Sequence, residues 1–268
     1  MINKQELSLI QLVKFKVKNI IIFILSIFRN IYRPFSFIVS YSYFVKQFIQ
    51  FQNLKKSSES ELPMKWQERY PILNERTSTT YFEPHYTFHP AWAARILKII
   101  DPKKHIDISS SLQFVTLVSA FIPIDFYDYR PVDIHLSGLH CGKSDLTNLP
   151  FEAGSIESVS CMHVVEHIGL GRYGDKLDPD GDLKAIKELQ RVISPGGTLL
   201  FVVPVGKARV QFNAHRIYDP VDLLEKFKGW ELMDFSLVDD QGRFWYQTSI
   251  SQAKDLYYGC GCFWLKKT

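Results

Sequence analysis

Two histidines and a glutamate lie together in the stretch His163-Val164-Val165-Glu166-His167, and a further histidine, His215, follows later in the chain. Histidine titrates near neutral pH, so these residue types suit a base that takes a proton from a substrate. We therefore regard His163, Glu166, His167 and His215 as candidate catalytic residues. Each could also be a structural hydrogen-bonding residue, and the sequence leaves that alternative open.

The same stretch also matches the H-x-x-E-H pattern of one class of zinc peptidases. In those enzymes two histidines four residues apart on a helix bind zinc, and the glutamate activates water. Here the pattern follows an apolar stretch typical of a strand and runs into Gly169, Gly171 and Gly174, which disfavour a helix. No sequence context favours a third ligand. We therefore expect no metal at this position.

Acidic and small residues follow the predicted strands. Asp107 and the triplet 109–111 (Ser-Ser-Ser) end the first apolar run, Asp128 ends the second, and Asp145-Leu146 precede a later one. In parallel α/β sheets, ligands bind beyond the carboxyl ends of the strands, where an aspartate can accept hydrogen bonds from ribose hydroxyl groups. These positions therefore predict a nucleoside-binding crevice. Capping of a loop or turn is the alternative role for Asp128 and Asp145.

The elements that position these residues alternate between strands and helices. The predicted strands are 105–108, 124–129, 139–141, 155–162 and 198–203, the predicted helices are 90–100, 112–121, 182–193 and 220–227, and 231–238 pairs with 257–265 as an antiparallel closing couple. Such alternation indicates an α/β fold with a mostly parallel sheet and helices on both faces.

Taken in order, these segments resemble the motifs of class I S-adenosylmethionine (SAM)-dependent methyltransferases. The segments are 107–111, 128, 145–151, 155–167 and 188–197, the last ending in Pro-Gly-Gly. Two stretches, 166–175 and 212–216, resemble more narrowly the uncharacterised family called domain of unknown function 268. The resemblance covers roughly residues 80–268. It implies a Rossmann-like class I methyltransferase sheet, mostly parallel with an antiparallel closing strand pair, and SAM as the cofactor.

The resemblance also implies roles for individual residues. The loop after the first strand would meet the methionine half of SAM, Asp128 the ribose, and Asp145 the adenine amino group, with Leu146 beside the ring. Methyltransferases usually have Gly-x-Gly in that loop, whereas this chain has three serines, which are small but resist positive φ. The implied cofactor-binding residues are Asp107, Ser109, Ser110, Ser111, Asp128, Asp145 and Leu146.

Three basic or aromatic residues are candidates for binding the acceptor. Arg172, Tyr173 and Arg216 could hold an anionic acceptor such as a phosphorylated or acidic sugar. Members of the resembled family often look like accessory enzymes of surface-glycan assembly, which implies a small-molecule or glycan-related acceptor. The second hypothesis is a non-catalytic Rossmann-like scaffold or binding protein of a glycan-assembly complex. The serine triplet favours the scaffold, whereas Asp128 and Asp145 favour the enzyme.

Charge is distributed unevenly along the chain. Residues 1–58 hold nine Lys and Arg against the single acid Glu6, whereas residues 59–268 hold 23 basic and 27 acidic residues. The second part therefore has no general attraction for nucleic acid, and we expect no nucleic-acid partner. We expect two parts, a basic and apolar helical N-terminal segment over 1–58 and a methyltransferase-like α/β domain over 62–268.

The N-terminal segment has uncharged apolar runs at 19–28 and 34–45. Both are shorter than the roughly 20 residues that a spanning helix needs. We expect a cationic surface helix on an anionic membrane, with a helical cover on protein or a signal anchor as alternatives.

The four cysteines show neither zinc spacing nor a disulfide framework. A cytoplasmic protein, peripheral at the inner face of the membrane, is the resulting expectation.

Overall fold

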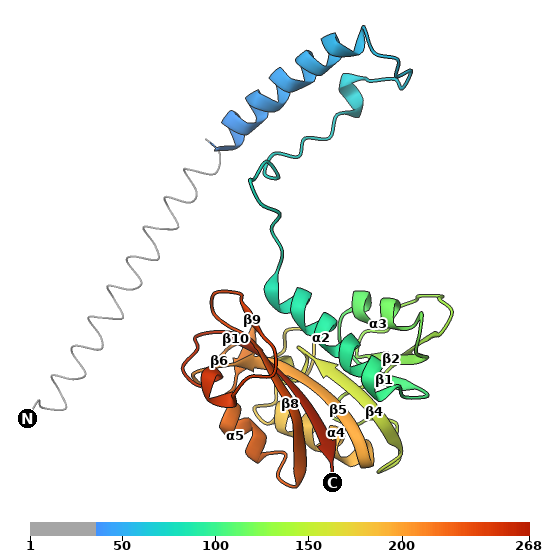
Figure 1. Ribbon diagram of the computed structural model, residues 1–268, viewed down its shortest axis with the longest axis vertical. Helices are drawn as coiled ribbons and strands as arrows, with labels where there is room; N and C mark the ends of the chain where they lie inside the picture. The colour runs from blue at the N-terminus through green and yellow to red at the C-terminus, as the bar shows by residue number, and fades with distance from the viewer. Residues whose placement is uncertain (1–35) are drawn as a thin grey trace, which may run out of the picture. The chain divides into compact units, whose positions relative to one another are not determined.

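The computed structural model describes residues 36–268, which fall into two units, one up to Tyr81 and one over Phe82–Thr268 (Figure 1). In the first unit residues 36–55 are helical, and the 3₁₀ helix η1 (Trp66–Glu68) follows. Much of the segment for which we expect membrane contact, residues 1–35, lies outside the described residues. Within 36–268, no helix is long and apolar enough to cross a membrane.

An eight-stranded sheet forms the centre of the second unit, with the strand order β3-β2-β1-β4-β5-β10-β8-β9 (Figure 1). The strands are β1 (His105–Ile108), β2 (Ile124–Asp128), β3 (Leu139–Lys143), β4 (Ile156–Met162), β5 (Ile193–Val205), β8 (Trp230–Val238), β9 (Phe244–Trp245) and β10 (Gly259–Lys267). Strands β1 to β5 pair in parallel, and β10 is antiparallel to both β5 and β8. The predicted Rossmann-like sheet, mostly parallel with an antiparallel closing pair, is confirmed.

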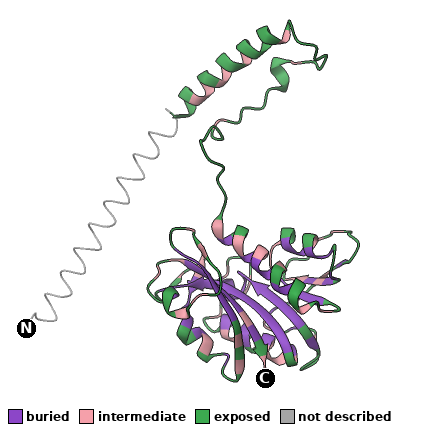
Figure 2. Cartoon of the chain, viewed as in Figure 1, coloured by how far each residue is buried: buried purple, intermediate pink, exposed green. Residues whose placement is uncertain are grey.

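Helices cover both faces of this sheet. The helices α2 (Pro84–Ile100) and α3 (Leu112–Val118) bury their apolar side chains on one face, and α4 (Gly181–Val192) and α5 (Pro220–Glu225) bury theirs on the other. Successive residues of a strand point to opposite faces, so Phe201 of β5 faces α4 and α5, while Val202 faces α2 and α3. The sheet is therefore buried on both sides (Figure 2).

Helix α2 begins six residues earlier than the predicted start at residue 90, and this shift matters for the site. The Glu83 side chain accepts a hydrogen bond from Tyr86 N at 2.6 Å and caps the helix, and Pro84 takes the first helical position, where a missing N–H has no consequence. Pro90, which suggested the start, lies inside the helix instead. Burial of Trp92 and Ile96 against the sheet outweighs the hydrogen bond that Pro90 removes.

A short hairpin that the sequence did not predict lies beside the sheet. It consists of β6 (Arg209–Gln211) and β7 (His215–Ile217), which pair antiparallel. Two further 3₁₀ helices are η2 (Val165–His167), which follows β4, and η3 (Ile250–Ala253), which precedes β10. The hairpin carries two of the candidate residues, His215 and Arg216.

Candidate functional site

A cavity of about 320 Å³ opens at the carboxyl ends of β1, β2, β3 and β4. The loops after these strands form one wall, and the loop 167–181 after η2 forms the other. After β1 the chain continues into α3, which packs on one face of the sheet. After β4 it continues into α4, which packs on the opposite face. The cavity therefore lies where the strand order reverses, which is the usual ligand position in such sheets.

The serine triplet after β1 performs three different structural tasks. Ser109 lines the cavity and donates through Oγ to Tyr127 O at 3.2 Å. Ser110 Oγ accepts a hydrogen bond from Met162 N at 3.1 Å and so ties the loop to the end of β4. Ser111 Oγ accepts from Phe114 N at 3.2 Å and caps α3. Of the three, Ser109 is the residue that faces the cavity.

Ser109 has a backbone φ of 55°. This left-handed conformation is free for glycine and unfavourable for other L-residues by roughly 1–2 kcal/mol. The loop thus has the shape that a glycine normally provides, although the residue is serine.

Asp107 lies behind the loop and is fully buried. Its carboxyl group accepts a hydrogen bond from Ser160 Oγ and another from Ser110 N at 3.0 Å. Burial raises the pKa of Asp107 to about 7, although these hydrogen bonds oppose the shift. Asp107 therefore holds the loop 109–111 in place from its buried side and does not line the cavity.

The two other predicted aspartates and the leucine all line the cavity. Asp128 is half-buried at the end of β2, where Oδ1 accepts from Arg130 N at 2.7 Å. Asp145 uses Oδ1 to accept from the backbone N and the hydroxyl of Thr147, at 2.8 and 2.7 Å, and so closes a turn. Leu146 is buried beside it and gives this end of the cavity an apolar wall.

The predicted catalytic residues His163, Glu166 and His167 form one contiguous group. Glu166 is 1% exposed, and its Oε1 lies 2.8 Å from His163 Nδ1 and 3.7 Å from His167 Nε2. Both histidine rings line the cavity, whereas the glutamate lies behind them. His163 has a φ of 58°, and this turn directly after β4 sets its ring beside Glu166.

The two histidines differ in their affinity for protons. Burial opposes a charge on His163, but Cys260 and Glu166 outweigh burial and raise its pKa to about 10. Burial lowers the pKa of His167, and its Nδ1–H donates to Ala214 O at 2.6 Å. His167 is therefore neutral near pH 7, with the lone pair on Nε2, whereas His163 holds its proton.

The zinc-peptidase arrangement is not formed by this stretch. Strand β4 ends at Met162, and η2 is a single 3₁₀ turn over Val165–His167. The two histidines therefore do not sit one turn apart on an α-helix, as that pattern requires.

The remaining predicted residues lie near the cavity, and among them Tyr173 alone lines it. Tyr173 lines the cavity, and the guanidinium groups of Arg130 and Arg172 lie 4.5 and 5.2 Å from the centre of its ring. His215 lies outside the cavity and stacks on Tyr258, with ring centres 4.9 Å apart. Arg216 is buried and donates to the carbonyl oxygens of residues 168, 178 and 179, so its guanidinium group supports the loop 167–181 from within.

Three residues near the site were missed by the sequence reasoning. His85 and His89 of α2 approach the ring of His163, with ring centres 5.5 and 5.1 Å apart, and Cys260 Sγ of β10 lies 3.3 Å from His163 Nε2. The spacing of four between His85 and His89 puts both on one helical face, which was a usable signal. Their proximity to His163 and Cys260 depends on tertiary packing and has no local signal.

Comparison with known proteins adds a family match for part of the chain. Residues 148–256 match the family described as "Caenorhabditis protein of unknown function, DUF268". The predicted resemblance to this family is thereby confirmed over the segment from β4 to η3, which contains the group formed by His163, Glu166 and His167. No curated protein matches the chain.

Several solved structures are similar to the chain at low sequence identity. The N-methyltransferase NodS from Bradyrhizobium japonicum, solved with S-adenosyl-L-homocysteine, is 12% identical with a TM-score of 0.47, and the match covers 81% of this chain and 97% of NodS. The 1,6-didemethyltoxoflavin-N1-methyltransferase from Burkholderia thailandensis is 12% identical with a TM-score of 0.47, covering 72% and 94%. The YcgJ protein from Bacillus subtilis is 10% identical with a TM-score of 0.48, covering 68% and 98%. Functional inference therefore rests on the geometry of the cavity.

Proposed function

We propose that the unit Phe82–Thr268 is a SAM-dependent methyltransferase that acts on a small-molecule or glycan-related acceptor. The observation that carries this proposal is Asp128, a half-buried carboxylate at the carboxyl end of β2 that faces the cavity. Its Oδ1 is engaged by Arg130 N, and among the described residues no hydrogen bond engages Oδ2. A carboxylate in this position suits the two hydroxyl groups of a ribose.

The cavity also suits the rest of the cofactor. Four aspartates line it (Asp128, Asp145, Asp175 and Asp178), and besides histidine the basic side chains on its wall are Arg130 and Lys176. An acidic wall favours a ligand that carries a sulfonium and an ammonium group. Leu146 offers an apolar contact for a planar base, and the backbone at Ser109 allows a close approach to the ligand.

SAM, when bound, would supply an electrophilic methyl group to an acceptor oxygen or nitrogen, with S-adenosylhomocysteine as the leaving group. The chain has to align the two reactants and remove the acceptor's proton. His167 is placed for the second task, because it lines the cavity, its lowered pKa keeps it neutral, and its Nδ1–H is held by Ala214 O at 2.6 Å. Glu166 lies behind both histidines and positions His163, whose Nδ1–H donates to Oε1 at 2.8 Å.

The mouth of the cavity suggests the acceptor's charge. Arg130 and Tyr173 line the cavity, and the Arg172 guanidinium group lies 5.2 Å from the Tyr173 ring centre. Two guanidinium groups on one aromatic ring favour an acceptor that carries a phosphate or carboxylate group. This feature supports the acidic or phosphorylated sugar expected from the sequence.

Calorimetry of the full chain with S-adenosylhomocysteine tests the proposal. We expect binding, and we expect Asp128→Asn to weaken it by roughly 5-fold to 150-fold, since a buried hydrogen-bonded partner contributes about 1–3 kcal/mol. Asp133→Asn is the matched control, because that carboxylate is almost fully exposed and lies outside the cavity wall. A folded chain that does not bind at millimolar ligand would refute the enzyme and favour the scaffold.

A further inference from the structure

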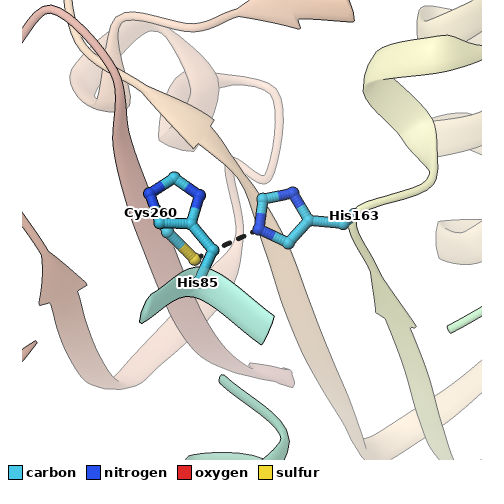
Figure 3. Close-up of side chains that lie close together, drawn as sticks. All are labelled: His85, His163 and Cys260. Carbon is cyan, nitrogen blue, oxygen red and sulfur yellow. Dashed lines mark hydrogen bonds between the residues drawn. The ribbon is translucent and has the colours of Figure 1, made fainter. Parts of the chain in front are cut away.

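Three side chains of types that bind metals lie close together beside the cavity (Figure 3). They come from parts of the unit that are distant in sequence. His85 comes from the start of α2, His163 from the turn after β4, and Cys260 from β10. Each offers one ligand atom, and the three atoms lie within 4.8 Å of one another, with His163 Nε2 3.3 Å from Cys260 Sγ. All three residues are buried.

These distances are close to those of a tetrahedral zinc site. Zinc binds imidazole nitrogen at about 2.0–2.1 Å and thiolate sulfur at about 2.3 Å, so two ligand atoms of one site are roughly 3.5 Å apart. The pair from His163 and Cys260 already meets that separation. The His85 ligand atom lies within 4.8 Å of both, so a closer approach of its side chain would complete the site.

Glu166 prepares His163 to act as a ligand. Its Oε1 lies 2.8 Å from His163 Nδ1, so the Nδ1 proton is held there. Loss of the Nε2 proton on metal binding would then leave a lone pair directed towards Cys260 Sγ, which lies 3.3 Å away. Histidines that bind metals almost always donate their second nitrogen to a carboxylate or carbonyl in this way. The left-handed backbone at His163, with a φ of 58°, maintains the arrangement at a cost in conformational energy.

A second observation favours a bound cation beside this group. Two buried acceptor atoms beside this group, His89 Nε2 and Glu166 Oε2, have no hydrogen-bond partner among the described residues. His89 is fully buried and donates its Nδ1–H to His85 O at 2.7 Å, so its Nε2 is left as a bare lone pair. Buried acceptors without donors are costly, so a cation bound beside them would be favourable.

We propose that His85, His163 and Cys260 bind a divalent transition metal of the zinc type at the inner wall of the cavity. Two nitrogens and one sulfur are the ligand set that zinc prefers, and hard cations such as magnesium and calcium avoid it. Three protein ligands leave a fourth position, which water or a substrate atom occupies in catalytic zinc sites. The site differs from the H-x-x-E-H pattern, because His163 alone is shared with it.

The test uses the full chain produced in zinc-supplemented medium. We expect about one zinc per chain by elemental analysis. After removal of zinc with a chelator and reloading with Co²⁺, we expect visible bands of a tetrahedral site and a near-ultraviolet band from sulfur-to-cobalt charge transfer. Cys260→Ser should abolish the sulfur band and weaken cobalt binding at least tenfold. Cys262→Ser is the matched control, because Cys262 is equally buried on the same strand and lies outside the ligand set.

Two further variants keep the test decisive if Cys260→Ser does not fold. His85→Gln lies at the start of a helix and should also lose zinc, and Glu166→Gln should weaken metal binding about 10-fold to 100-fold through His163. Absence of zinc and of a cobalt spectrum in the wild-type chain would overturn the proposal. Equal loss in Cys262→Ser and Cys260→Ser would overturn it as well. Binding of S-adenosylhomocysteine is measured separately, so the two proposals can fail independently.

Discussion

Gly169 and Gly174 offer a matched pair of substitutions in the loop that walls the cavity. Both have the same left-handed backbone, with φ of 80° and 81°. A Cβ atom at Gly174 would meet nothing within 4 Å, whereas one at Gly169 would lie less than 3.0 Å from the carbonyl oxygen of Asp178. Alanine at either position therefore carries the same backbone penalty, and alanine at Gly169 carries a steric clash in addition.

The expected magnitudes follow from these two terms. Gly174→Ala should lower the free energy of unfolding by about 1 kcal/mol, the penalty of an L-residue in this conformation. Gly169→Ala should lower it by about 2–4 kcal/mol, because an overpacked position adds about 1–3 kcal/mol. Thermal unfolding should then shift by about 2–4 °C for the first variant and about 4–16 °C for the second.

Gly169→Ala should also abolish binding of S-adenosylhomocysteine in calorimetry, since Gly169 lines the cavity and its N–H donates to Asp175 Oδ2 at 2.7 Å. Gly174 lies outside the cavity wall, so Gly174→Ala should retain binding. Equal stability of the two variants would refute the reasoning, because the backbone term alone would then account for both.

Two further predictions concern β1 and its loop. Chemical denaturation should show Ser109→Gly to be about 1 kcal/mol more stable than Ser109→Ala, because both lose the hydroxyl and glycine alone accepts a φ of 55° freely; equal stabilities would show that this conformation is unstrained. Asp107 has a pKa of about 7 in the folded state against 3.8 ordinarily, so its contribution to stability is complete below pH 3.8 and is lost as the pH rises through 7. Between pH 6 and 8 the wild-type chain should therefore lose about 1 kcal/mol more than Asp107→Asn, and parallel pH profiles would contradict the buried, protonated carboxyl group.

The sequence predicted most of the sheet, because strands such as β1, β2 and β4 have a clear local pattern, whereas the two-residue strand β9 was not predicted. The apolar run at β1 matches its prediction, and the pairing of β8 with β10 was expected from two apolar segments at the end of the domain. The hairpin formed by β6 and β7 was not predicted, because strands of three residues with partly exposed side chains show no periodicity of apolar residues. The start of α2 was placed too late because Pro90 imitates a first-turn proline.

The candidate site shows the same contrast between residues that have a local sequence signal and residues that tertiary packing brings together. Residues that follow strands, such as Asp128 and Ser109, could be placed beside the cavity from strand order alone. Arg216 could not, since its burial under the loop 167–181 depends on a hairpin that the sequence does not reveal. His85 and Cys260 approach His163 across large distances along the chain, and no periodicity or motif encodes that approach.

The position of β10 bears on how the chain acquires its fold during synthesis. β10 comes last of the strands in the chain, yet it lies inside the sheet, between β5 and β8. β8 and β9 are therefore synthesised before β10, the strand that connects them to β1–β5. Their apolar residues stay unpaired with the rest of the sheet until about twenty further residues have been made. Until β10 arrives, β5 and β8 each have an unpaired edge, which is a template for pairing with another nascent chain. We expect nascent chains of this protein to need a chaperone, or slow release, in the interval before β10 is inserted.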